Sequence, residues 1–310
     1  MKKFLKRFCL FLLLPMSGCV LVLLQPLDRE YAWKSLPGDC DGRGAWIWHR
    51  LYADTLPVDI AFLGSSHTID GIQDNLISSA FKKNGKGKTA ANLGYCRFGR
   101  EMLSVIARDL FTTQNPRYVV IEINEEMTRS SHPVYPYYAQ TEDVLAPPSF
   151  IQSAYPSNIY EAFLARLSQL RFRLFCGRLN DTIPVSSFGY GGCPGSANPD
   201  ELVPPEPTVP HSPGIWRSFQ NRYPAAWTCQ LVELCRQNGA QVFFLYIPSF
   251  HDQPAPEEGM ELYSQLGQVL VPPAELLREK DCWRDADHLN NKGSERLSNW
   301  VTGQLGADSF

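Results

Sequence analysis

The chain has 310 residues and a formal net charge of −3, with 44% hydrophobic and 20% charged residues. This length allows one large domain or two small ones with a sizeable core. Because the charge gives no basic footprint, nucleic acid is excluded as an expected partner. No CxxC pair or Cys/His spacing is typical of a metal site, so the sequence predicts neither a metal nor another cofactor.

The first feature along the chain is an uncharged, mostly apolar run over residues 8–24. Four basic residues precede it: Lys2, Lys3, Lys6 and Arg7. Positive charges before an apolar segment favour a cytoplasmic N-terminus and leave the remainder outside. Residues 1–25 therefore predict a single membrane anchor or a cleaved signal peptide, with the main domain extracytoplasmic. The sequence MSGC at 16–19 also leaves open a lipoprotein that carries its lipid on Cys19.

Strand and helix patterns alternate after a stretch at 26–57 that we interpret as a connector. Short apolar runs predict strands over 58–63, 89–93, 118–123, 242–248 and 269–271. Helical spacing of apolar residues predicts helices over 72–83, 100–112, 224–238, 257–266 and 291–305. Such alternation favours an α/β domain over 58–310, built on a parallel sheet with helices on both faces.

A Pro- and aromatic-rich region interrupts this alternation at about 127–220. It contains one evident helix, over 157–174, and we interpret it as an insertion that packs over the site. Seven cysteines lie beyond the apolar N-terminal run, so an exported protein is expected to oxidise some of them. Seven is an odd number, so at least one thiol stays free, and the pairing is left open.

Small polar residues follow the ends of the predicted strands. Ser66 follows the first strand, Gly94 the second and Asn124 the third, while Asp285 and His288 precede the last helix. In a doubly wound sheet, sites form outside the carboxyl ends of the strands. Four separate segments are therefore expected to deliver these residues to one edge of one sheet.

These residue types fit nucleophilic catalysis. A serine hydroxyl needs a base within hydrogen-bond reach and a third group that orients the base. His288 is expected to take the proton of Ser66, with Asp285 rather than Asp287 holding the ring. The negative charge that develops on a carbonyl oxygen needs preorganised donors. The backbone N–H of Ser66 or Gly94 and the side-chain amide of Asn124 are the candidates for this oxyanion hole.

At these positions the chain resembles the SGNH (GDSL-like) hydrolase superfamily. Residues 62–67, FLGSSH, are similar to its first block, although Ser65 stands where the usual block has Asp. Gly94 and Asn124 resemble the second and third blocks, and Asp285-x-x-His288 resembles the last. The resemblance implies a three-layer flavodoxin-like fold with a Ser-His-Asp triad at Ser66, His288 and Asp285.

In its Gly-Ser-Ser turn and its N-terminal anchor the chain most resembles membrane-anchored envelope acyltransferases, such as the teichoic-acid D-alanyl transfer protein and the alginate O-acetyltransferases. This resemblance implies acyl transfer or ester hydrolysis on an envelope polysaccharide at the cell membrane. A single anchor also implies a membrane protein that supplies the acyl group. Two alternatives stay open: a tethered but otherwise ordinary carbohydrate or lipid esterase, and a catalytically silent binding or assembly protein for envelope glycan.

Overall fold

The centre of the molecule is a sheet of five parallel strands in the order β2-β1-β3-β4-β5. The computed structural model describes residues 1–36, 39–85, 87–123, 131–175, 177–179, 186–198, 202, 214–251 and 260–307. The strands are β1 (Ile60–Leu63), β2 (Ala90–Asn92), β3 (Tyr118–Ile123), β4 (Gln241–Tyr246) and β5 (Gln268–Leu270). All five lie within a few residues of the predicted ranges, and their short apolar runs are typical of parallel strands buried on both faces.

Helices cover both faces of the sheet. The helices that alternate with the strands are α4 (Ser66–Gly71), α5 (Asp74–Lys83), α6 (Arg100–Thr113), α10 (Gly214–Gln237), α11 (Met260–Leu266) and α12 (Asn291–Ala307). Apolar side chains of α6 and α10 pack on the sheet face that contains Ala61 and Leu63. Those of α5 and α12 pack on the face that contains Ile60 and Phe62. The fold is therefore a three-layer flavodoxin-like α/β fold, as the sequence predicts.

The stretch interpreted as a connector packs into the core. It forms α2 (Arg29–Lys34), η1 (Asp39–Gly42), α3 (Arg43–Trp48) and a π-helical turn η2 (His49–Ala53). Trp33, Ile47 and Leu51 in these elements are fully or nearly fully buried in the core of the α6 face. Their apolar surface is sequestered from water together with the sheet, so this stretch acts as an additional part of that layer.

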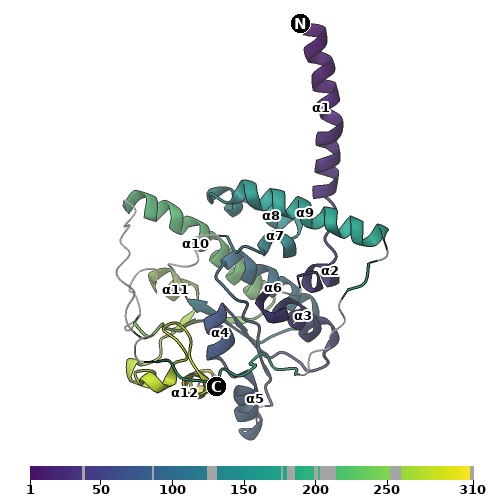
Figure 1. Ribbon diagram of the computed structural model, residues 1–310. Helices are drawn as coiled ribbons and strands as arrows, with labels where there is room; N and C mark the ends of the chain where they lie inside the picture. Colours follow the sequence, from purple (N-terminus) through teal and green to yellow (C-terminus); the bar gives the residue numbers. More distant parts are fainter. Residues whose placement is uncertain are drawn as a thin grey trace.

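The interrupting region contributes α7 (Tyr135–Tyr138), α8 (Thr141–Val144), η3 (Pro147–Ile151) and α9 (Tyr155–Leu174). The single long helix predicted here is thus present as α9. The helices of this region gather at the base of α1, away from α4, which begins with Ser66 (Figure 1). Residues 186–198 run beside the start of α12, where the Tyr190 hydroxyl donates to Asn291 Oδ1 at 2.7 Å. Two short turns, η5 (Ala274–Leu276) and η6 (Lys280–Cys282), precede α12.

The N-terminal helix α1 (Lys2–Leu23) stands out from the body (Figure 1). Its 22 residues are long and apolar enough to cross a membrane, a property that signal sequences share. Its last turn is fixed to the body because the Thr141 hydroxyl donates to the Leu23 carbonyl at 2.8 Å.

Candidate active site

Ser66 lies at the first position of α4, directly after a tight turn that ends β1. The turn begins at Gly64, where a Cβ would collide with Thr68 Oγ1 and with the carboxylate of Glu122. Ser65 is the N-cap of α4, and its Oγ accepts the N–H of His67 at 3.1 Å. The sequence Gly-Ser-Ser therefore folds so that Ser66 leaves the carboxyl end of the strand at the start of a helix.

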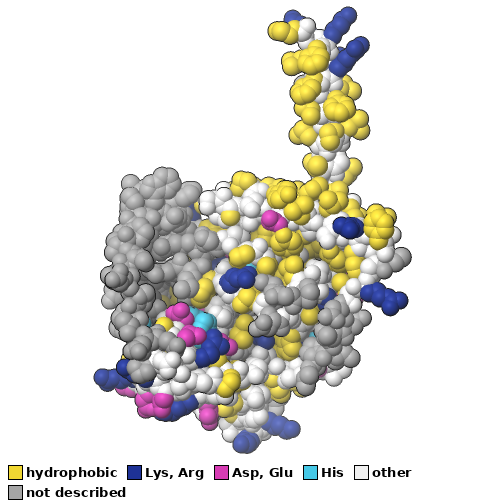
Figure 2. All heavy atoms as spheres, viewed as in Figure 1, with side chains coloured by type: hydrophobic (Ala, Val, Ile, Leu, Met, Phe, Trp, Pro, Cys, Tyr) yellow, Lys and Arg dark blue, Asp and Glu magenta, His cyan; other side chains and the backbone are white. Residues whose placement is uncertain are grey.

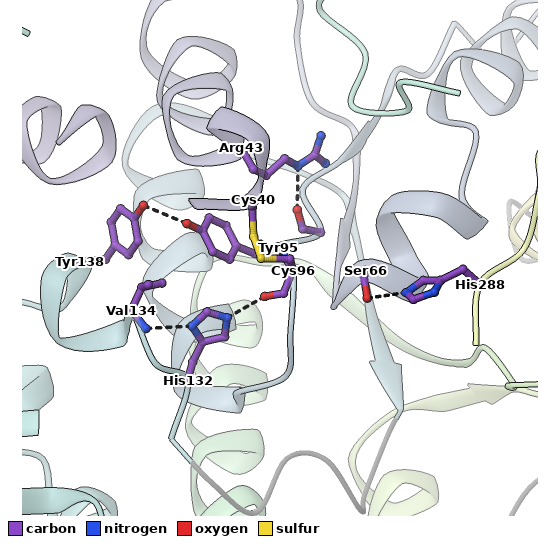
Figure 3. The surroundings of a disulfide bond; sticks show 10 residues. Cys40, Arg43, Ser66, Tyr95, Cys96, His132, Val134, Tyr138 and His288 are labelled. Carbon is purple, nitrogen blue, oxygen red and sulfur yellow. Dashed lines mark hydrogen bonds between the residues drawn. A yellow bond between two sulfur atoms is a disulfide. The ribbon is translucent and has the colours of Figure 1, made fainter. Parts of the chain in front are cut away.

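Ser66, His288 and Asp285 form one continuous hydrogen-bonded series. Ser66 Oγ lies 2.9 Å from His288 Nε2, and the two side chains point toward each other (Figure 3). His288 Nδ1 lies 2.8 Å from Asp285 Oδ1. The structure thus brings together the three residues that the sequence suggested as a triad, although they come from segments 222 residues apart.

Asp285, and not Asp287, is the acid that contacts the histidine. Asp285 Oδ1 also accepts the backbone N–H of His288 at 2.8 Å and that of Asp287 at 2.9 Å. Burial alone would raise the pKa of Asp285, but the Asp287 N–H and the His288 ring outweigh it and the pKa is lowered. An ionised Asp285 can only accept, so the proton of His288 is on Nδ1 and Nε2 is left to accept from the Ser66 hydroxyl.

Arg284 contacts the second carboxylate oxygen of Asp285. Its Nε lies 3.2 Å from Asp285 Oδ2, and its Nη1 lies 3.1 Å from Asp70 Oδ2 and 3.2 Å from Cys193 Sγ. The guanidinium therefore links the loop before α12 to α4 and to residues 186–198. The planar, permanently charged group suits this bridging role between two carboxylates.

Glu122 on β3 is a part of the site that the sequence analysis missed. Its carboxylate accepts the Ser65 N–H at 2.7 Å, the Ser65 hydroxyl at 2.8 Å and the Thr68 hydroxyl at 2.6 Å. The side chain is only 3% exposed, so these charge-assisted bonds form in a low-dielectric interior. A lone carboxylate inside an otherwise apolar strand, one residue from its end, was the signal that could have found it.

Asn92 and Gly94 position α4 from the neighbouring strand. The Asn92 amide donates to the carbonyls of Thr68 at 2.7 Å and Ile72 at 2.8 Å, which are acceptors at the end of α4. A Cβ on Gly94 would lie 2.9 Å from the Ser65 carbonyl oxygen, so only glycine allows this close approach. The Gly94 N–H donates to Asn92 Oδ1 at 3.1 Å, and its carbonyl accepts from Arg43 at 2.8 Å.

The predicted oxyanion donors differ in whether they already have a hydrogen-bond acceptor. The N–H of Ser66 is at the first position of α4, where helical N–H groups have no partner within the helix, and it has no acceptor among the described residues. The N–H of Gly94 is bonded to Asn92. Asn124 lies outside the described residues. Of the predicted donors in the described part of the chain, the Ser66 N–H is therefore the one left without an acceptor.

His67 packs against the ring of His288. Its ring is 3% exposed and contacts the ring of His288 edge-on, with 5.3 Å between the centroids. Phe98 contacts the same His67 ring at 5.4 Å. The contact with His67 limits the positions open to the His288 ring, and Phe98 packs on His67 itself.

One group in the described residues has the spacing of metal ligands: Glu279, Asp281 and Cys282. Lys292 Nζ lies 2.6 Å from Asp281 and 2.9 Å from Glu279, and Arg296 also pairs with Glu279. Because cations of the chain already neutralise these exposed carboxylates, the group is accounted for as a surface ion-pair network.

A disulfide joins the region that follows α1 to the loop that follows β2. Cys40 and Cys96 are bonded, with 5.7 Å between their Cα atoms (Figure 3). Free thiols in the described residues beyond α1 are Cys193, Cys229, Cys235 and Cys282. Some of the seven cysteines are thus oxidised and others free, as expected, while Cys176 lies outside the described residues.

Among known proteins, the chain is similar to solved structures but matches no family model. No family model matches the chain, and no curated protein matches it. The chain is similar to the crystal structure of a "putative acylhydrolase" from Bacteroides fragilis NCTC 9343, at 12% identity and a TM-score of 0.37. The match covers 84% of this chain and 94% of that chain. At this TM-score the similarity supports no inference about the site or its chemistry.

Proposed function

We propose that this protein is a membrane-tethered serine acyltransferase or esterase that acts on O-acyl groups of a cell-envelope polysaccharide. The observation that carries the proposal is the hydrogen-bonded series from Ser66 Oγ through His288 to Asp285. A base at 2.9 Å from a serine hydroxyl, oriented by an ionised acid, is the arrangement that activates a serine nucleophile.

In the first half-reaction, Ser66 Oγ attacks the carbonyl carbon of the acyl ester while His288 Nε2 takes the hydroxyl proton. Asp285 stabilises the imidazolium that forms. The carbonyl oxygen carries the negative charge of the tetrahedral intermediate, which the Ser66 N–H and the Asn124 amide are proposed to stabilise, because the predicted Gly94 N–H is already bonded to Asn92. Collapse of the intermediate breaks the ester bond, and His288 returns its proton to the departing alcohol.

In the second half-reaction, a new hydroxyl attacks the acyl-Ser66 ester. His288 removes the proton of this hydroxyl and then returns a proton to Ser66 Oγ when the acyl bond breaks. If the hydroxyl is that of water, the product is a free acid and the protein is an esterase. If it belongs to a sugar, the acyl group has moved to the glycan and the protein is a transferase.

The proposed substrate class follows from α1. A membrane-spanning α1 with basic residues at its start favours an extracytoplasmic position for the domain, where O-acylated envelope polymers are found. A transferase in this position has no route to a cytoplasmic acyl donor through one helix. It therefore requires a membrane protein that delivers the acyl group.

The test is labelling of the full chain, in detergent micelles, with a fluorophosphonate probe that forms a phosphonyl ester on an activated serine and releases fluoride. Wild-type protein is expected to label, and Ser66→Ala and His288→Ala are expected to abolish labelling. Ser79→Ala is the matched control, because Ser79 is an exposed serine on α5 and its loss leaves the site intact.

A folded wild-type chain that does not label would contradict the proposed chemistry and favour the glycan-binding alternative. Where labelling is seen, hydrolysis of a simple acetyl ester with and without an oligosaccharide acceptor separates the two enzyme activities. Acetylated oligosaccharide as a product indicates a transferase, whereas acetate alone indicates an esterase.

A further inference from the structure

Large apolar side chains are exposed on one part of the body. Beyond residue 24, the described residues include seven large hydrophobic side chains that are exposed. Six of the seven lie between residues 145 and 175: Leu145, Phe150, Tyr160, Leu167, Leu174 and Phe175. Scattered single apolar residues on a surface are ordinary, but a concentration within one segment indicates a contact surface.

Helix α9 turns its apolar side outward. Tyr160, Leu167 and Leu174 are spaced by seven residues, so they share one face of the helix, and they are 58%, 45% and 76% exposed. The opposite face is buried and largely polar or small, with Asn158, Ala162, Ala165, Arg166 and Gln169. A helix of a soluble domain normally shows the reverse, because its apolar face packs on the core.

The buried polar face of α9 holds the chain that leaves α1. The Arg166 side chain donates to the carbonyl of Gln25 at 3.0 Å, and Gln169 donates to that of Pro26 at 3.1 Å. The Asp28 N–H donates to Gln169 Oε1 at 2.6 Å. These bonds fix α9 across the base of α1 (Figure 1). Whatever surrounds the base of α1 is therefore also next to α9.

We propose that the exposed α9 face, defined as Phe150, Tyr160, Leu167, Leu174 and Phe175, lies on the surface of the lipid bilayer that α1 enters. Figure 2 shows hydrophobic side chains continuing from α1 onto the body at its base. An α9 set crosswise to a spanning α1 lies along the bilayer surface, where an amphipathic helix buries its apolar face among the acyl chains. The inference rests on the membrane tether in the proposed function and is independent of the chemistry at Ser66.

The basic residues near the end of α9 fit the same surroundings. Arg171, Arg173 and Arg178 lie at or just after its last turn and are exposed. Long basic side chains at an interface extend to the headgroups while their methylene stems cover apolar surface. A protein partner is a less complete explanation, because it would have to cover α9 without obstructing the membrane at the base of α1.

This contact would fix the direction of the active site. The helices α5 and α12 lie at the end of the body opposite α9 (Figure 1), and α12 follows the loop that carries His288. With α9 on the bilayer, the body cannot rotate freely about the tether. The Ser66 edge is then presented to polymer beside and beyond the membrane rather than to the lipid itself.

The experiment is photo-crosslinking of the full chain in vesicles of phosphatidylcholine and phosphatidylglycerol. Benzoylphenylalanine is placed singly at Leu167, at Phe175 and at Lys83, an exposed position at the end of α5 that serves as the control. A fourth variant carries it at Leu13 within α1. Phospholipid adducts, measured by mass spectrometry, are expected at Leu13, Leu167 and Phe175. No adduct is expected at Lys83.

Adducts at Leu13 without adducts at Leu167 and Phe175 would overturn the inference and leave the tether standing. Adducts at none of the positions would overturn both. Crosslinks from the α9 positions to a second copy of the chain, in place of lipid, would show that the α9 face is a protein contact and so contradict the bilayer assignment. Labelling of Ser66 in the same samples reports separately on the catalytic proposal.

Discussion

The edge of the sheet at Ser66 and the surface at α9 differ in how their polar side chains are oriented and bonded. At the Ser66 edge, the carboxylates of Glu122 and Asp285 accept hydrogen bonds that hold the turn at Ser66 and the His288 ring in place. At α9, the polar side chains of Arg166 and Gln169 are turned inward and the apolar ones outward. The carboxylates of the first region have partners within the chain, whereas we infer that the exposed apolar side chains of the second contact the bilayer.

Apart from replacing Ser66 or His288, the change expected to lower the labelling rate most at the Ser66 edge is loss of the Asp285 carboxylate. Asp285→Asn removes the acceptor that selects the His288 tautomer, and the labelling rate is expected to fall about 10⁴-fold, as for the equivalent change in a serine protease. Asp287→Asn is the matched control, because only the backbone of Asp287 contacts the site. Equal losses in both variants would mean that the Asp285–His288 contact does not orient the base.

A second test asks whether Glu122 stabilises the turn that carries Ser66. Glu122→Gln places an amide where three donors now find a carboxylate, leaving buried groups unsatisfied at a cost of about 3 kcal/mol. We expect the Tm to fall by about 5 °C or more and the labelling rate to fall with it. Glu261→Gln, at an exposed position on α11, serves as the control. An unchanged Tm would show that the turn holds without this acid.

A third effect, seen only as a pH dependence, concerns the contact between the two regions. Glu101 on α6 accepts the Ser131 hydroxyl at 3.2 Å, and the same hydroxyl accepts from Asn158 of α9 at 2.9 Å. Burial raises the pKa of Glu101 from 4.5 to about 7, although the His132 N–H opposes the shift. Between these two pH values the folded state therefore retains a proton that the unfolded chain has lost.

The contribution of Glu101 to stability is therefore complete below its ordinary pKa and is lost as the pH rises toward 7. Relative to wild type, Glu101→Gln keeps a neutral side chain at every pH and is expected to remove up to about 3 kcal/mol of this dependence. The measurement is the difference in Tm between the two proteins at pH 5 and pH 8. Parallel pH profiles would mean that Glu101 does not titrate between these values.

The parts that sequence could predict are those that depend on local order. The strands show as short apolar runs, and Ser66, Asp285 and His288 were identifiable because each sits just beyond a strand or before the last helix. Glu122 was not identifiable in the same way, because a short apolar run shows that β3 is buried on both faces but not which turn each side chain contacts. Its partners, Ser65 and Thr68, lie more than 50 residues away in the sequence.

The helix α9 shows a second limit. Its spacing predicts a helix, but the same spacing would ordinarily predict that Leu167 and Leu174 face the core. The outward orientation arises because Arg166 and Gln169 bond to backbone carbonyls that follow α1, a long-range contact without any local signal. The core role of residues 26–57 was missed for a similar reason, since Trp33 and Ile47 bury against elements far along the chain.

The bridge between Cys40 and Cys96 closes a covalent ring that contains β1 and Ser66. A protease that cut the chain once within this ring would leave both fragments attached until the bridge was reduced. Because such bonds persist in oxidising compartments, the ring also records the side of the membrane on which the domain folded. Alkylation of these two thiols in intact cells, before and after reduction, would therefore determine the topology without any reporter fusion.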